Sequence, residues 1–208
     1  NSTPPTNRSQ RGSEFGFCKE FLTRGSIEPL TAIERGFFFE SWNERRFRDD
    51  LIGAGVPAAE VECLQFRQDN HSRSSRGVLR GLHFQLLPEP QGKLVRCSVG
   101  RIFDVAVDLR SASPSYGRWV GATLSADNHQ QLWVPVGFAH GFLTLSGVAE
   151  VQYKASGFWN RDCERSLRWD DPNLMIQWPL EQAGTTSPVL AAKDAEAPML
   201  DVLDDSNE

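Results

Sequence analysis

Apolar residues recur with helical spacing in one early part of the chain, directly after the run Phe37–Phe39. Four of them fall near a 3.6-residue period, namely Trp42, Phe47, Leu51 and Ile52. Gly53 and the Gly55–Pro57 turn then end the pattern. The sequence therefore predicts one good helix here, ahead of a long region with a different period.

That later region alternates between apolar and polar positions. In 102–109 one face carries Phe103, Val105, Val107 and Leu109, and the other carries Asp104, Ala106 and Asp108. The segments expected to be short strands are 94–99, 102–109, 119–124, 131–134, 141–145 and 149–154. Turn clusters such as Ser113–Gly117 separate strands at spacings of about ten residues, which is typical of a sandwich or barrel, here a jelly roll. The C-terminal part, punctuated by prolines, reads as loops with one short helix.

Composition is that of a single globular domain. Hydrophobic residues make up 39% and charged residues 24% of the 208 residues, which excludes a disordered or collagen-like protein. No run of 18 apolar residues occurs, so no membrane partner is expected. Residues 27–203 are assigned to one domain. Residues 1–26 are interpreted as a disordered leader or cloning remnant, and 204–208 as an acidic tail.

Charge is concentrated at the C-terminal end of the chain. The formal net charge is -5, but the last 15 residues hold six acids and no Lys or Arg. The other 193 residues carry 22 basic and 21 acidic side chains. Such a neutral body argues against nucleic acid as a partner, since that requires a basic face. An anionic ligand would have to be met by a local cluster of Arg and Lys.

The cysteines are spread out and indicate a reducing compartment. The four residues Cys18, Cys63, Cys97 and Cys163 form no CxxC pair, and no secretory apolar segment precedes them. We therefore expect reduced thiols and a cytoplasmic protein.

Candidate chemistry gathers around two of the four histidines. His83 follows Arg80 by three residues, and His140 lies between glycines in 137–141. A barrel interior could bring His83, Lys93, His140 and Tyr153 together from different strands, although a lone strand histidine is more often structural. A metal centre usually needs three ligands, often spaced HxH, and no second histidine follows His83 at i+2, so no metal is expected.

At these positions the chain resembles the dTDP-4-dehydrorhamnose 3,5-epimerases of the cupin superfamily, over about residues 27–203. The runs that carry the resemblance are 34–40, 68–72, 77–85, 91–97, 103–110, 135–142, Asp171-Pro172, Trp178-Pro179 and Lys193-Asp194. The resemblance implies a mainly β, cupin-type double-stranded β-helix (jelly roll) with a few short helices. It also implies a homodimer that exchanges N-terminal strands, and the apolar stretch 35–39 is too apolar to stay exposed.

The family's substrate is dTDP-4-dehydro-6-deoxy-D-glucose, whose C4 ketone acidifies the protons on C3 and C5. Inversion at each carbon needs a base on one face, an acid on the other and a cation beside the enolate oxygen, with no cofactor. By resemblance His83 is the base, held by Asp194, and Tyr153 is the acid. Lys93 stabilises the enolate, with His140 and Arg80 nearby.

The remaining positions implied by the resemblance hold the nucleotide sugar. They are Arg35, Glu40, Gln68, Asn70, Arg80, Glu164 and Lys193. The chain departs from the family at Phe158-Trp159, where a Tyr-Tyr pair is common and the second tyrosine stacks on thymine. Trp159 offers a larger π face for the same contact.

Three other functions compete with the 3,5-epimerase. An epimerase that acts at one carbon, or on a related dTDP-4-keto sugar, would use the same acid and base. A non-catalytic sugar-binding cupin would be expected to lose His83 or Tyr153, and both are present. A metal-dependent cupin oxygenase would bind stoichiometric metal.

Overall fold

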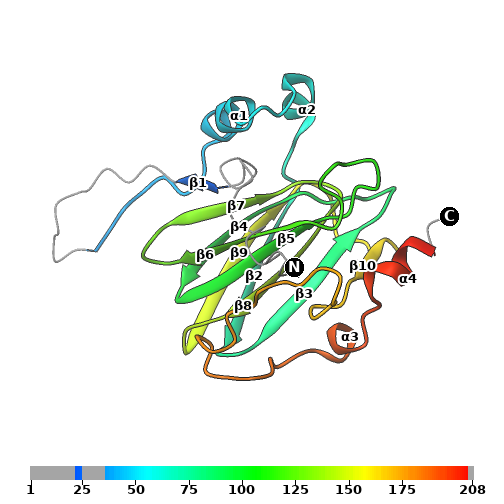
Figure 1. Cartoon of the computed structure of the whole chain (residues 1–208). Coiled ribbons are helices and arrows are strands. Elements are labelled where there is room, and N and C mark those ends of the chain that lie inside the picture. The colour runs from blue at the N-terminus through cyan, green and yellow to red at the C-terminus, as the bar shows by residue number, and fades with distance from the viewer. Residues whose placement is uncertain (1–21, 25–35, 206–208) are drawn as a thin grey trace, which may run out of the picture.

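The computed structural model describes residues 22–24 and 36–205, and two five-stranded antiparallel sheets face each other in it (Figure 1). One sheet has the order β1-β7-β4-β9-β2 and the other the order β10-β3-β8-β5-β6. The first contains β1 (Leu22–Arg24), β7 (Gln130–Val134), β4 (Lys93–Val99), β9 (Val148–Ala155) and β2 (Gln68–Ser75). The second contains β10 (Glu164–Ser166), β3 (Leu79–Gln85), β8 (Phe138–Thr144), β5 (Arg101–Asp108) and β6 (Trp119–Ser125). This is the predicted jelly-roll architecture.

The six predicted strands are confirmed as β4 to β9, with boundaries that shift by up to three residues. The largest shift is in β8, which begins at Phe138 and so includes His140. Strands β2 and β3 were not delimited from the sequence. In β2 the residues alternate between half-buried and exposed with hardly an apolar side chain among them, so the period-two signal of hydrophobicity is missing.

The predicted helix is confirmed as α1 (Glu44–Gly53). It begins at Asn43, whose side chain accepts a hydrogen bond from the Arg46 N–H and so caps the first turn. A second helix, α2 (Ala58–Cys63), follows Pro57, and both helices stand at one end of the sheets (Figure 1). Near the C-terminus the chain forms two short helices rather than one, α3 (Ala192–Ala195) and α4 (Leu200–Asp205).

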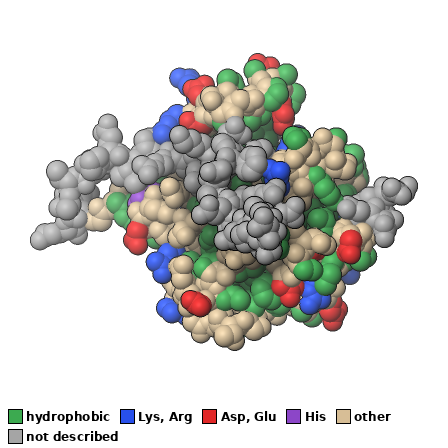
Figure 2. Space-filling view, in the orientation of Figure 1, with side chains coloured by type: hydrophobic (Ala, Val, Ile, Leu, Met, Phe, Trp, Pro, Cys, Tyr) green, Lys and Arg blue, Asp and Glu red, His purple; other side chains and the backbone are tan. Residues whose placement is uncertain are grey.

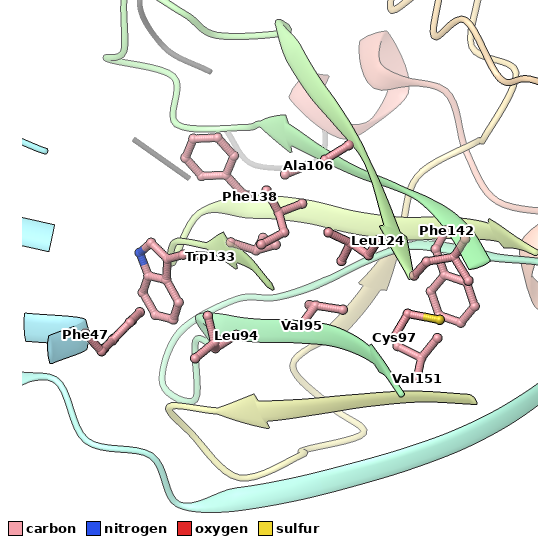
Figure 3. Close-up of a cluster of buried hydrophobic side chains, with 14 of the residues drawn as sticks. Phe47, Leu94, Val95, Cys97, Ala106, Leu124, Trp133, Phe138, Phe142 and Val151 are labelled. Atoms are coloured by element: carbon pink, nitrogen blue, oxygen red, sulfur yellow. The ribbon is translucent and has the colours of Figure 1, made fainter. Parts of the chain in front are cut away.

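The main core fills the space between the two sheets (Figure 3). Val95 of β4 and Val151 of β9 face Ala106 of β5 and Phe142 of β8 across this space, and Trp133 extends the cluster toward Phe47 of α1. A second cluster lies on the outer face of β5, where Val105 and Val107 are covered by C-terminal residues that include Leu200. Both faces of β5 are therefore buried, and Asp104, on the face of Ala106, points into the barrel.

Elements of the structure extend past the predicted domain boundaries, residues 27 and 203, at both ends. Leu22–Arg24, which belong to the predicted leader, pair with β7 as an edge strand, and the rest of 1–26 lies outside the described residues. At the other end α4 continues through Asp204 and Asp205, the first two residues of the predicted tail.

Charged side chains of both signs are interspersed on the face drawn in Figure 2. Among the described residues, no helix is long and apolar enough to cross a membrane.

Candidate active site

A bulge in β3 places two candidate residues on the same face of the sheet. Arg80 lies opposite Phe142 of β8, and His83 lies opposite His140. An interval of three residues on β3 is therefore paired with an interval of two residues on β8. Gly81, at the bulge, has φ +117°, and a Cβ there would lie 2.6 Å from the Cα of Gly141. Only glycine fits this close approach of β3 to β8. Arg80 and His83 therefore both face the barrel interior, and the Arg80 Nε donates to Ser74 Oγ on β2 at 2.9 Å.

His83 forms a close pair with Asp194, the residue that the resemblance places beside it. The distance from His83 Nε2 to Asp194 Oδ1 is 2.6 Å, and Asp194 Oδ2 accepts the Gly81 N–H at 3.3 Å. Asp194 belongs to α3 and is 2% exposed. Burial alone would raise the pKa of Asp194, but the hydrogen bonds from His83 and Gly81 and the nearby Lys193 outweigh it and lower the pKa.

The carboxylate of Asp194 determines which imidazole nitrogen can react. An ionised Asp194 only accepts hydrogen bonds, so it holds the proton on Nε2 of His83. The lone pair is then on Nδ1, away from Asp194. This is the arrangement of a histidine that is ready to accept a proton from carbon.

Tyr153 lies on the opposite sheet. It is on β9, with Val95 of β4 and Asn70 of β2 as its cross-strand neighbours, so its side chain shares the inner face of that sheet with Val95. Burial raises the pKa of the Tyr153 phenol, and the negative charge of Glu164 raises it further. The phenol therefore stays protonated at neutral pH and can act as an acid.

Lys93 lies between these two groups. Its Nζ donates to the His83 backbone carbonyl at 3.3 Å and lies 5.9 Å from the centre of the Tyr153 ring. Burial lowers the pKa of Lys93 to about 8, although the charges of Glu164 and Asp104 act in the opposite direction. An ammonium group in such a buried place interacts strongly with any negative charge that forms beside it.

His140 has a buried carboxylate partner of its own. Its Nε2 is 2.7 Å from Asp104 Oδ1, and Asp104 is fully buried on the inner face of β5. Asp104 Oδ2 has no hydrogen-bond partner in the described part of the chain. The His140–Asp104 pair on β8 and β5 lies beside the His83–Asp194 pair, since His83 and His140 are cross-strand neighbours.

The predicted sugar-binding residues are only partly brought together. Gln68 and Asn70 of β2 are joined by a 3.0 Å hydrogen bond, and Lys193 pairs with Glu164 at 3.2 Å. Trp159, 54% exposed, lies in the segment after β9.

Two further predicted residues stand apart from this group. Glu40 lies ahead of α1, where it accepts a hydrogen bond from Asn43 and pairs with Arg46. Arg35 lies outside the described residues. The roles of all these residues in binding stay predictions.

Three residues that support this site were not singled out from the sequence. Asp104 holds His140, Ser74 holds Arg80, and Gln85 bonds the segment that carries Trp159. Asp104 and Asp108 carry a weak signal in the sequence, because each lies between apolar residues of a strand, where a buried acid is unusual. Ser74 and Gln85 carry no such signal.

The arrangement has the parts that proton transfer beside a carbonyl requires. A base on one sheet, an acid on the other and a buried cation between them suit removal of a carbon-bound proton and its return from the other face. Among residues 22–24 and 36–205, no three His, Cys, Asp or Glu side chains gather in a way that could hold a metal ion.

Comparison with known proteins identifies the family. A model of the dTDP-4-dehydrorhamnose 3,5-epimerase family matches residues 28–201. The chain belongs to this family. The dTDP-4-dehydrorhamnose 3,5-epimerase of Salmonella typhimurium is 54% identical over 176 residues, which cover 84% of this chain and 89% of that protein. The resemblance read from the sequence is thereby confirmed, and family members of this name are isomerases.

Solved structures of the family share the fold. The epimerase of Legionella pneumophila, in complex with dTDP-4-keto-L-rhamnose, has a TM-score of 0.77 and 42% identity, covering 90% of this chain and 91% of that one. A 3'-monoepimerase of Streptomyces bikiniensis, in complex with dTDP-quinovose, has a TM-score of 0.75 and 28% identity, covering 89% and 86%. The predicted cupin-type fold is confirmed by these likenesses.

Proposed function

We propose that this chain epimerises dTDP-4-dehydro-6-deoxy-D-glucose at C3 and C5 to dTDP-4-dehydro-L-rhamnose, a step of dTDP-L-rhamnose biosynthesis. Relatives of about half identity carry the name of this activity, and the Legionella pneumophila structure holds a dTDP-4-keto sugar. The observation that carries the proposal is that His83 of one sheet, paired with Asp194 of α3, lies opposite Tyr153 of the other sheet.

The mechanism follows from the positions of these groups. His83 Nδ1 removes the proton from a carbon next to the C4 ketone, and the electron pair of the C–H bond moves into an enolate. Lys93 stabilises the negative charge that develops on the ketone oxygen. Tyr153 then returns a proton from the opposite face, which inverts the carbon. The hydrogen leaves and returns as a proton, so the reaction as written has no redox step.

Each turnover needs this pair of proton transfers once at C3 and once at C5. Both carbons flank the same ketone, so one oxyanion site serves both enolates. Between the two steps His83 must give up its proton and Tyr153 must regain one, and exchange with solvent does both. Arg80, Lys193 and the partly covered Gln68 and Asn70 suit the diphosphate and the hydroxyl groups of the nucleotide sugar.

Product analysis tests the proposed activity. The protein is incubated with dTDP-4-dehydro-6-deoxy-D-glucose, the ketones are reduced with borohydride, and the released 6-deoxyhexoses are identified by chromatography. Rhamnose is expected among the products. Recovery of only the sugars that unreacted substrate gives would contradict the proposal.

A single-carbon epimerase is the second candidate, since the Streptomyces bikiniensis 3'-monoepimerase has a similar fold. The two activities share base, acid and cation, so the reduced sugars separate them. Sugars inverted at C3 alone, without rhamnose, would favour this second candidate.

We also infer that the chain works as a homodimer. Phe37 and Phe38 are 78% and 84% exposed in the single chain, although each has a large apolar ring. A second copy that covers them would remove this apolar surface from water. Light scattering at micromolar concentration should give twice the chain mass, and the double variant Phe37→Ser/Phe38→Ser should weaken association. A wild-type mass of one chain would contradict the inference.

The cysteines support a cytoplasmic location, which we propose as well. Cys63, Cys97 and Cys163 are free, as expected in a reducing compartment. Fractionation of the source cells should therefore recover the protein with cytoplasmic markers, and recovery with an extracytoplasmic fraction would contradict the proposal.

A further inference from the structure

The segment from Gly157 to Asn160, after β9, is held by glutamine side chains at each of its residues. Gln91 Nε2 donates to the Gly157 carbonyl at 2.8 Å, and Gln68 Oε1 accepts the Trp159 N–H at 3.0 Å. The other two contacts come from Gln85. Its Nε2 donates to the Phe158 carbonyl at 3.1 Å, and its Oε1 accepts the Asn160 N–H at 2.9 Å.

Gln85 differs from the other two glutamines because its amide bonds the main chain on both sides of Trp159. It is 7% exposed, and its Nε2 also donates to the Glu89 carbonyl. Both N–H groups and the oxygen of the amide are thus used. A buried amide with all its groups bonded has one orientation, because turning it would leave buried polar atoms without partners.

Gln85 also connects the segment to the strand of the proposed base. It lies on β3 two residues after His83, and residues two apart on a strand share a face. The position of Trp159 is therefore fixed relative to His83 through two hydrogen bonds of a single side chain. The Trp159 side chain itself is about half exposed, so its ring is available to a ligand.

We propose that Gln85 is a positioning residue that holds the 157–160 segment so that Trp159 is a preformed stacking surface for the thymine base. This inference rests on the proposed function, since it assigns a determinant of nucleotide affinity at the same site. A segment that is already ordered loses less conformational entropy when the nucleotide binds. Gln85 thus sets the affinity for the nucleotide and leaves the rate of proton transfer unchanged.

The test is a double-mutant cycle on nucleotide binding. The dissociation constant of dTDP is measured by calorimetry for wild type, Gln85→Met, Trp159→Ala and the double variant. Methionine keeps the length of the side chain but cannot bond the Phe158 carbonyl or the Asn160 N–H. Gln177→Met is the matched control, because Gln177 is exposed and donates only to the Met175 carbonyl.

Base stacking on an aromatic side chain is worth enough to change affinity by about tenfold or more. We expect Gln85→Met and Trp159→Ala each to weaken dTDP binding by about tenfold, and the control to leave it unchanged. The double variant should bind as weakly as Trp159→Ala alone, since Gln85 acts through Trp159. With substrate, Gln85→Met should raise KM by a similar factor and leave kcat within about twofold.

Three results would overturn the inference while leaving the proposed function intact: unchanged dTDP binding by Gln85→Met, losses that multiply in the double variant, or a fall in kcat at constant KM. A wild-type protein that does not bind dTDP would instead contradict the proposed function itself. If Gln85→Met does not melt cooperatively, Gln85→Glu is used under the same criteria. It keeps the acceptor for the Asn160 N–H but loses the donor to the Phe158 carbonyl.

Discussion

The imidazole of His83 and the carboxylate of Asp194 meet at 2.6 Å although 111 residues separate them in the chain. Asp194 reaches this position from α3, and its second oxygen is bonded to the Gly81 N–H inside the bulge of β3. The bulge therefore does two things at once. It turns His83 into the barrel, and it presents the N–H that fixes the partner of His83.

Removal of the Asp194 charge should impair the base without unfolding the protein. We expect Asp194→Asn to lower kcat by about 10²-fold or more, because an amide neither stabilises the imidazolium nor holds the reactive tautomer. Glu196→Gln, an exposed acid two residues away, is the control and should keep full activity. Wild-type kcat in Asp194→Asn, measured by steady-state kinetics, would argue against the pair.

Tyr153→Phe should separate proton removal from proton return. The variant keeps the ring but lacks the transferable proton, while His83 and Lys93 stay in place. Epimerised product should fall by about 10²–10⁴-fold, with some solvent exchange retained at the abstracted position. Tyr116→Phe, at the other tyrosine of the chain, should behave as wild type. Near wild-type epimerisation by Tyr153→Phe would assign the acid to another group, and His140 would be examined first.

Activity should fall at alkaline pH through Lys93. The pKa of this buried ammonium is lowered to about 8, so the charge beside the enolate is present below pH 8 and lost above it. We expect kcat to decline with pH above about 8 for the wild type. A lysine with its ordinary pKa would keep kcat level up to about pH 10. That second profile would show that Lys93 is not the group that stabilises the enolate.

The same burial predicts that Lys93 lowers the stability of the fold. The pKa of Lys93 is about 8 in the folded protein, whereas its ordinary value is 10.5. Between these two pH values the unfolded chain binds more protons than the folded one, so the free energy of unfolding rises with pH. Below pH 8 the buried charge costs about 3 kcal/mol. Lys93→Met should therefore raise the free energy of unfolding at pH 7 by about 2 kcal/mol in denaturant titrations, while it removes activity. A loss of stability would contradict this.

The strands with apolar alternation could be predicted from the sequence, whereas the polar strand β2 could not. Its inward side chains, Gln68 and Asn70, belong to the candidate site, so the residues that suit a ligand also remove the hydrophobic signal. The bulge at Gly81 could not be predicted from the sequence either. Arg80 and His83, three apart, would face opposite ways on a regular strand, and only the register against β8 puts them on one face.

Strand periodicity does not say which side chains meet across a barrel. The resemblance to the family therefore supplied the proposed roles of His83, Tyr153, Lys93 and Asp194. In the structure the His83 imidazole bonds the Asp194 carboxylate, and the Lys93 ammonium donates to the backbone carbonyl of His83. Two residues that support the site, Gln85 and Ser74, could not be predicted from the sequence. Gln85 and Ser74 act through side-chain hydrogen bonds that join different strands or loops, and such bonds leave no pattern along the chain.

In the proposed mechanism, one base and one acid on opposite sheets invert two carbons beside one ketone. Proton NMR of dTDP-4-dehydro-6-deoxy-D-glucose in deuterated water with the wild-type protein tests it most directly. We expect the signals of both H3 and H5 to disappear by exchange as the L-rhamno product forms, and we expect His83→Ala to abolish exchange at both carbons. Exchange at one carbon alone, or exchange at both that survives in His83→Ala, would contradict it.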